Sequence, residues 1–335
     1  MPTYRQTVAG LYSELRLDRY IAEKLGLLSR SQIKARQLTS KINGNEVKIS
    51  RLVKNGDEIE LIWNAAEPVN IIPENIPLNI IFENDRVIAI NKPQGMVVHP
   101  GAGNRQGTFA NALYYRKINR GFPQTEDFKT EYLQTYDLRT FGSRPGIVHR
   151  LDKDTSGVMI AAYDDETLAF LAGQFKSGKV RKTYIAIING IPKEKKGRIE
   201  TCIARDPRNR KCFTVTARGR PALTCYSVIK TWRTHSLILL QPKTGRTHQL
   251  RVHLRYIGHP VTGDPLYGFT DTLFPNASLM LHSRILGITL PGETQPSTFK
   301  APLPQRFKEM IHFLNISHGD MEAQRHKEGE YGGTK

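Results

Sequence analysis

The run His-Arg-Leu-Asp-Lys-Asp-Thr-Ser-Gly at residues 149–157 places two carboxylates and three potential cations within nine positions. In an extended backbone Asp152 and Asp154 would face the same side, and Arg150 would share it. Such a carboxylate pair could serve a metal-dependent nuclease or a glycosidase. The alternative is a structural turn whose aspartates accept backbone N–H groups, and the spacing alone favours this alternative. The residues of the loop alone therefore do not establish a catalytic role.

Three histidines in the C-terminal third raise the question of a metal site: His248, His253 and His259. The first two are five residues apart, which on a helix turns their side chains to different faces, and the glutamate of a His-Glu-x-x-His motif is missing. The sequence also lacks Gly-x-x-x-x-Gly-Lys-Ser/Thr and Gly-x-Gly-x-x-Gly. We therefore expect neither a metal ion nor a cofactor.

Rigid elements should hold the acidic loop, as they do for many catalytic loops. The apolar runs GIVHR (residues 146–150) and GVMIAA (residues 157–162) predict buried strands on either side of it. The following residues, 163–175, predict a helix that is capped by Asp164 or Asp165.

Short strands dominate the rest of this region. Residues 80–93 form two apolar runs that turn at Asn84-Asp85, and Thr108 can cap a helix running to about Lys117. Further strand-like runs occupy residues 182–190, 222–230 and 236–242. Many strands and few helices predict an α+β fold with a mixed, mainly antiparallel central sheet and flanking helices. We expect this domain to span residues 78–315.

The first residues have a pattern of their own. Leu17, Ile21 and Leu25 recur at four-residue spacing before Gly26, which predicts an amphipathic helix. A second, short helix capped by a serine carries three basic residues, Arg30, Lys34 and Arg36.

Turn signals follow these helices. Asn43-Gly44 indicates a hairpin, and Gly56-Asp57 precedes an alternating strand at residues 58–62. We expect a small domain at residues 14–62 and a proline-containing linker at residues 63–77.

Charge points to an acidic partner. The chain has 49 Lys and Arg against 31 Asp and Glu, a formal net charge of +18. Such an excess attracts a polyanion through counterion release, although a merely soluble basic surface is the alternative. The sequence has no long apolar run and no signal-peptide core, so we expect a cytoplasmic protein. The polar residues 316–335 predict a disordered tail.

The N-terminal pattern resembles a known RNA-binding module. The phrases RLDRYIAEKLG, SRSQIKARQ, INGNEV and VKNGDEIEL are similar to the small RNA-binding domain first described in ribosomal small-subunit protein four. The basic second helix of that domain lies against RNA phosphates. The resemblance therefore implies that Arg30, Lys34 and Arg36 bind RNA; without it, a solvated helix face would remain the alternative.

A second resemblance covers most of residues 78–305. NKPQGMVVHPG, GIVHRLDKDTSGVMIAA, RKTYIAIINGIP and PKTGRTHQLRVHLRYIGHPVTGDPLYG occur in the order typical of ribosomal large-subunit pseudouridine synthases of the RluA type. The N-terminal module and the loop HRLDKDTSG resemble the D-type subgroup. The resemblance implies isomerisation of uridine to pseudouridine at stem-loop uridines of large-subunit (23S) ribosomal RNA, free or in a precursor particle.

That family's motifs imply roles for individual residues. Asp152, and not Asp154, matches the catalytic aspartate, which attacks the anomeric carbon or works through a glycal so that uracil detaches, rotates and rejoins through carbon 5. Tyr184 matches the tyrosine that stacks on the target base. Arg150 matches the residue that enters the RNA stack as the uridine leaves it.

The partner of the aspartate is assigned in the same way. Arg246 best matches the arginine that pairs with the catalytic carboxylate, and Arg251 is the alternative because helix geometry could bring it to the same region. We also expect His149 and Arg251 to contact RNA. Ser283 stands where the family pattern suggests alanine.

Two alternative functions are also compatible with these features. A non-catalytic RNA-binding assembly factor would suit the charge and the N-terminal module, and a related enzyme could act on transfer RNA instead. We expect a monomer whose partner is structured RNA.

Overall fold

The computed structural model describes residues 2–28, 33, 36–64, 71–101, 103–119 and 146–317. The chain divides into two units, residues 1–69 and residues 70–335. Each unit has its own buried core.

The N-terminal unit is built from short antiparallel strands around a helical segment. A four-stranded sheet has the order β1 (Thr3–Thr7), β6 (Glu58–Ile62), β3 (Thr39–Ile42), β4 (Asn45–Glu46). The smaller sheet pairs β2 (Leu15–Arg16) with β5 (Leu52–Val53), and the helical segment is α1 (Leu17–Arg19) with the π-helical η1 (Tyr20–Lys24).

Several predictions for this unit are confirmed. Leu17 and Ile21 are buried as the amphipathic pattern requires, and the turns at Asn43-Gly44 and Gly56-Asp57 precede β4 and β6. The expected start at residue 14 is too late, because β1 pairs with β6 along its whole length.

The basic second helix cannot be checked in full. Arg30 and Lys34 lie outside the described residues, and Arg36 is half-buried. The predicted tail at residues 316–335 also falls outside them from residue 318 onward, whereas residues 305–317 are helical.

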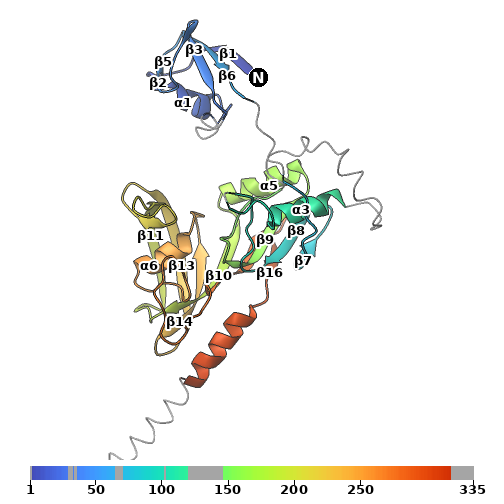
Figure 1. The fold of residues 1–335 in the computed structure, drawn as a ribbon, viewed down its shortest axis with the longest axis vertical. Helices are drawn as coiled ribbons and strands as arrows, with labels where there is room; N and C mark the ends of the chain where they lie inside the picture. Colours follow the sequence, from blue (N-terminus) through green and yellow to red (C-terminus); the bar gives the residue numbers. More distant parts are fainter. Residues whose placement is uncertain are drawn as a thin grey trace, which may run out of the picture. The chain divides into compact units, whose positions relative to one another are not determined.

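The second unit contains a ten-stranded sheet (Figure 1). Its order is β12 (Phe213–Val215), β11 (Lys196–Arg205), β13 (Arg220–Thr231), β14 (His235–Pro242), β10 (Arg181–Asn189), β15 (Leu281–Ile288), β9 (Ser156–Ala162), β8 (Val87–Lys92), β7 (Ile80–Glu83), with β16 (Ser297–Lys300) beside β15. Every neighbouring pair is antiparallel except β9 and β15, which confirms the mixed, mainly antiparallel sheet.

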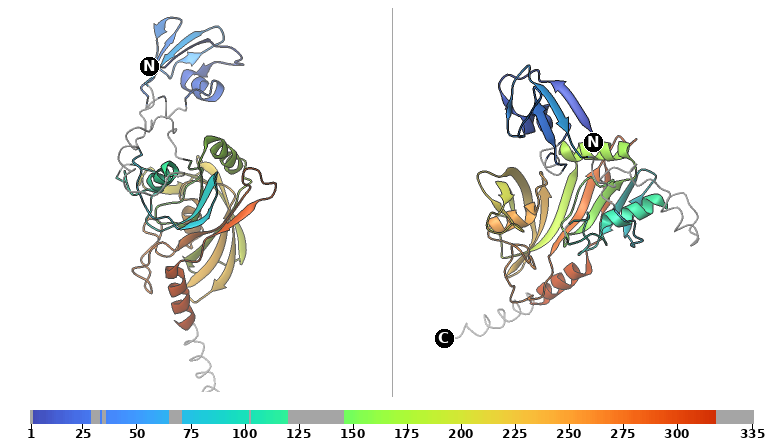
Figure 2. Two further views of the ribbon diagram at one scale, coloured as in Figure 1. Left: turned by 90° about the vertical axis from the view of Figure 1, so that its right-hand side faces the viewer. Right: turned by 45° about the horizontal axis from the view of Figure 1, so that its top comes forward.

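Helices flank this sheet, as predicted. They are α3 (Phe109–Ile118), α5 (Asp165–Lys176), α6 (Gln249–Tyr256) and a helix over residues 305–317. Thr108 caps α3 and Asp164 caps α5, in agreement with the expected N-termini. Figures 1 and 2 show the helix at residues 305–317 on the side of the unit away from α5.

The alternation of apolar residues along β8 explains why α3 and α5 cover different faces. Ile88 and Ile90 pack in one core with Phe109 and Leu113 of α3. Val87 and Ala89, which point the other way, pack with Leu171 of α5.

Part of the predicted linker belongs to the second unit. The amide of Asn111 donates to the carbonyl of Ile72 at 2.7 Å, and Glu74 accepts the backbone N–H of Gly107. Residues 71–77 therefore pack on this unit. Within the ranges that the structure describes, none of the helices combines the length and the apolar character that crossing a bilayer requires.

The predicted strand at residues 146–150 is wrong. This segment makes a single bridge, between Ile147 and Ala161, and the imidazole Nε2 of His149 accepts the N–H of Ile160 at 3.1 Å. A side chain thus takes the place of a ladder partner, so the segment before the acidic loop runs without strand pairing.

Gly157 fixes where that loop ends. Its φ of +115° is unfavourable for other residues, and a Cβ there would lie 2.1 Å from the carbonyl oxygen of Ser283. Only glycine allows β9 to approach β15 this closely at the parallel joint.

Candidate active site

A cavity of about 560 Å³ lies at the acidic loop, a volume typical of small-molecule sites. Its wall comes mainly from residues 148–152, the end of α5, the first half of β10, and the segment from β14 to α6. Six basic side chains line it: Arg150, Lys176, Lys182, Lys243, Arg246 and Arg251. Among the described lining residues Asp152 is the single acid, so the cavity favours an anionic ligand while offering one carboxylate.

Asp152 and Asp154 do not act as a pair. The N–H of Thr155 donates to the carbonyl of Asp152 at 3.1 Å, which closes a turn through Lys153 and Asp154. Because the backbone is not extended there, the two aspartates do not face the same side, and Asp154 is not part of the cavity wall. This corrects the extended geometry considered for a nuclease or glycosidase pair.

A buried lysine holds the turn in place. The ammonium group of Lys92, at the end of β8, donates to the carbonyls of Pro93, Met96 and Lys153 at 2.8 to 2.9 Å. Burial lowers its pKa to about 7, against the charges of Asp154 and Asp152, while three carbonyl acceptors suit the three hydrogens of an ammonium. Lys92 thus ties the turn to the neighbouring loop.

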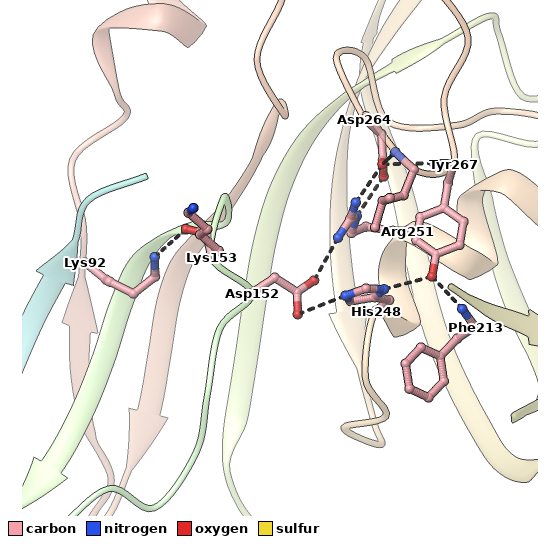
Figure 3. Close-up of polar contacts among 9 residues, drawn as sticks. Lys92, Asp152, Lys153, Phe213, His248, Arg251, Asp264 and Tyr267 are labelled. Atoms are coloured by element: carbon pink, nitrogen blue, oxygen red, sulfur yellow. Dashed lines mark hydrogen bonds and ion pairs between the residues drawn. The ribbon is translucent and has the colours of Figure 1, made fainter. Parts of the chain in front are cut away.

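The carboxylate of Asp152 faces the guanidinium of Arg251 (Figure 3). Nη1 of Arg251 lies 3.4 Å from Oδ2 of Asp152, and its Nε and Nη2 each donate to Asp264 at 2.7 Å. Burial alone would lower the pKa of Arg251, but the bonds to Asp264 raise it above its ordinary value. A permanent cation therefore stands beside Asp152.

The prediction that Arg246 pairs with Asp152 is wrong. Its Nε donates to the carbonyl of Pro221 at 3.0 Å, and the alternative, Arg251, makes the contact instead. Arg246 precedes α6, whereas Arg251 lies within α6, whose helical geometry turns it toward the carboxylate.

His248 lies beside the other oxygen of Asp152, with Nε2 3.9 Å from Oδ1. Its Nδ1 is 2.8 Å from the hydroxyl of Tyr267, and that hydroxyl accepts the backbone N–H of Phe213 at 2.8 Å. The ring of Tyr267 also lies under the guanidinium of Arg251, 5.0 Å away. The sequence analysis considered His248 only as a possible zinc ligand. It assigned no role to Asp264 or Tyr267, which belong to the motif GDPLYG.

Tyr184 lines the same cavity, on β10 next to a register shift between β10 and β15. Burial raises its pKa to about 12, while a hydrogen bond with Ser283 opposes that rise and the charge of Asp152 adds to it. The phenol therefore stays neutral and presents an aromatic ring near the carboxylate. Ser283 also donates to the carbonyl of Val158.

The two residues before Leu151 differ in setting. Arg150 is exposed at the cavity, where a cation can reach a ligand. His149 stacks on Phe175, and burial with the charge of Lys182 lowers its pKa to about 3. With Nε2 already bonded to the N–H of Ile160, the neutral ring of His149 holds the segment before the acidic loop in place at the cavity wall.

The far end of the loop is tied to the C-terminal helix. Arg306 donates to the hydroxyl of Ser156 at 2.7 Å, and Nδ1 of His282 lies 2.8 Å from the same hydroxyl. Across the described ranges, His, Cys, Asp and Glu side chains do not gather in groups of three or more that could hold a metal ion.

Comparison with known proteins gives this geometry a family. The RNA pseudouridylate synthase profile matches residues 86–256, which include the acidic loop, β10 and α6. Ribosomal large subunit pseudouridine synthase D of Borreliella burgdorferi is 42% identical over 304 residues, covering 88% of this chain and 87% of that protein. The protein of that name from Haemophilus ducreyi is 34% identical and covers 94% of both chains.

Solved structures agree with the fold. Human RNA pseudouridylate synthase domain containing 4 superposes with a TM-score of 0.54 at 25% identity, over 71% of this chain and 93% of that one. Human RNA pseudouridylate synthase domain containing 1 superposes with a TM-score of 0.52 at 26% identity, over 69% of this chain and 85% of that one. With the profile, the close relatives and the fold in agreement, the chain belongs to the RNA pseudouridylate synthase family and is a pseudouridine synthase.

Proposed function

We propose that this protein isomerises uridine to pseudouridine in large-subunit ribosomal RNA and that Asp152 is its catalytic carboxylate. The observation that carries the assignment is the position of Asp152 beside Arg251, as the one acid among the described residues of a cavity wall that also carries six Lys and Arg side chains. The basic wall suits a phosphate backbone. The substrate follows from relatives named as ribosomal large subunit pseudouridine synthase D.

The residues around Asp152 have separate roles in the proposed reaction. Arg251 holds the carboxylate in place by a charge-assisted contact, whether the carboxylate attacks the anomeric carbon or works through a glycal. The ring of Tyr184 stacks on the uracil, and base stacking contributes roughly 1 to 3 kcal/mol. Arg150, exposed at the cavity, fills the gap that the extruded uridine leaves in the RNA stack. Residues of the N-terminal unit, including Arg30, Lys34 and Arg36, hold phosphates farther along the RNA.

The setting of the reaction completes the proposal. The protein acts as a monomer in the cytoplasm, on free ribosomal RNA or a precursor particle. Its charge of +18 favours association with either.

The test uses RNA from cells that lack the gene, with RNA from cells that carry it as the modified reference. Large-subunit ribosomal RNA and transfer RNA lacking the modification are incubated with the protein, and pseudouridines are mapped by carbodiimide-dependent primer-extension stops. New stops confined to stem-loops of large-subunit RNA support the proposal. Stops only in transfer RNA would overturn the substrate, and RNA binding without any stop would favour a non-catalytic assembly factor.

A further inference from the structure

The environment of His248 determines which of its ring nitrogens carries the hydrogen. Tyr267 accepts the N–H of Phe213, and its own single hydroxyl hydrogen has Nδ1 of His248 as a partner at 2.8 Å. If Nδ1 carried the hydrogen instead, Tyr267 would receive two donors with its own hydrogen unpaired, and the lone pair of Nε2 would face the Asp152 carboxylate. The hydrogen-bond partners therefore assign the ring hydrogen to Nε2.

Tyr267 and His248 are both uncharged near neutral pH. Burial raises the pKa of Tyr267 to about 12, so its hydroxyl keeps the hydrogen. Burial also lowers the pKa of His248, with Arg251 and Arg150 acting in the same direction against Asp152 and Asp264. Among the residues that the structure describes, these four charged groups act most strongly on the ring, and desolvation outweighs the attraction of the two carboxylates.

We propose that His248 is a positioning residue, whose Nε2–H is aimed by Tyr267 at Oδ1 of Asp152 while Arg251 holds Oδ2. The inference rests on the proposed function, because the carboxylate held in this way is the proposed catalytic one. The 3.9 Å separation of Nε2 and Oδ1 would shorten when RNA closes the site, as catalytic hydrogen bonds commonly do. A neutral donor orients the carboxylate without the full second charge that would reduce its reactivity.

The backbone at His248 allows a matched pair of variants. His248 precedes α6 with a φ of 55°, in the left-handed region that asparagine tolerates well. His248→Asn can keep the bond to Tyr267 but is too short to reach Asp152. His248→Gln is longer by one methylene and places an amide N–H near the position of Nε2.

The kinetic test uses the full-length protein with its modifiable RNA. We expect His248→Asn to lower kcat by about ten- to a hundredfold, the range for losing a hydrogen bond to a charged group, with KM for RNA little changed. His248→Gln should recover most of that loss. Equal kcat in the two variants, wild-type kcat in His248→Asn, or a loss confined to KM would each overturn the proposal.

A spectroscopic test needs no RNA. Long-range ¹H–¹⁵N spectra of the labelled full-length protein show which ring nitrogen of each of the ten histidines carries the hydrogen, and the His248→Asn spectrum identifies the signal. We expect Nε2–H at His248 and a mixture of both forms in Tyr267→Phe, which keeps the ring under Arg251. An Nδ1–H form in the wild type would overturn the inference even if the enzyme is active. A protein inactive on every RNA would instead overturn the proposed function.

Discussion

Arg251 and Asp264 are joined by two hydrogen bonds of 2.7 Å, from Nε and Nη2 of the guanidinium to the two oxygens of a fully buried carboxylate. Asp264 is itself fixed, since Oδ1 also accepts the backbone N–H groups of Leu266 and Tyr267. Arg251 is therefore anchored on one side and offers Nη1 to Asp152 on the other. The position of the proposed catalytic carboxylate depends on an acid that does not line the cavity.

Asp264→Asn tests this anchoring. The substitution keeps the shape but removes the charge opposite a buried guanidinium, and breaking such a pair costs about 3 to 5 kcal/mol. We expect a free energy of unfolding lower by about that amount, and a lower kcat in the folded fraction because Arg251 is no longer fixed. Urea unfolding and turnover assays measure the two effects, with exposed Glu194→Gln as control. Wild-type stability and turnover in Asp264→Asn would contradict the anchoring role.

Arg246 and Arg251 should respond differently to substitution. Arg251→Lys loses the planar fork that spans Asp264 and Asp152, so kcat should fall by about tenfold or more. The side chain of Arg246 contacts Pro221 and not Asp152, so Arg246→Lys should weaken RNA binding with little effect on kcat at saturating RNA. The two constants are separated by titrating RNA in single-turnover assays. The opposite pattern would return the pairing role to Arg246.

Stability should fall in mild acid. Burial lowers the pKa of His149 to about 3 and those of His253 and His282 to about 4, against 6.5 for an exposed histidine. Between these limits the unfolded chain binds more protons than the folded one, so the free energy of unfolding decreases as pH drops below about 6.5 and levels off near 3. Urea titrations from pH 4 to 8 measure the slope. His253→Gln should reduce this slope, and a slope unchanged by His253→Gln would refute this account.

Basic residues at the turns around β12 should contact RNA phosphates. Arg208 and Arg218 are exposed on either side of this strand, and the bond from Phe213 to Tyr267 ties the strand to the site. Each substitution to alanine should reduce the slope of log affinity against log salt by about 0.7 to 0.9, the value for one phosphate contact. Binding titrations at several salt concentrations measure this, with Lys308→Ala on the C-terminal helix as control. An unchanged slope would exclude these turns from the RNA interface.

Local signals in the sequence predicted the elements well. The caps at Thr108 and Asp164 and the turns at Asn43-Gly44 and Gly56-Asp57 were predictable because they depend on a few neighbouring residues. The strand expected at residues 146–150 failed because its apolar pattern does not reveal that the His149 ring takes the place of a ladder partner.

The site was predictable only in part. Asp152, Tyr184 and Arg150 were identified by their motifs, and the structure places all three on one cavity. The choice between Arg246 and Arg251 required the rotation of α6, which spacing alone does not fix. The links from Asp264 to Arg251 and from Tyr267 to His248 join separate turns of the chain, and no local pattern encodes such contacts.

Asp152→Asn gives the most direct test of the account. The substitution keeps the backbone turn, in which the carbonyl of Asp152 accepts the N–H of Thr155, and removes only the ionised carboxyl group. Asp154→Asn, two residues along the same turn and off the cavity wall, is the matched control. On the modifiable RNA we predict wild-type RNA affinity in both variants, carbodiimide-dependent stops with Asp154→Asn, and none above background with Asp152→Asn. Stops of wild-type strength with Asp152→Asn would contradict the central claim.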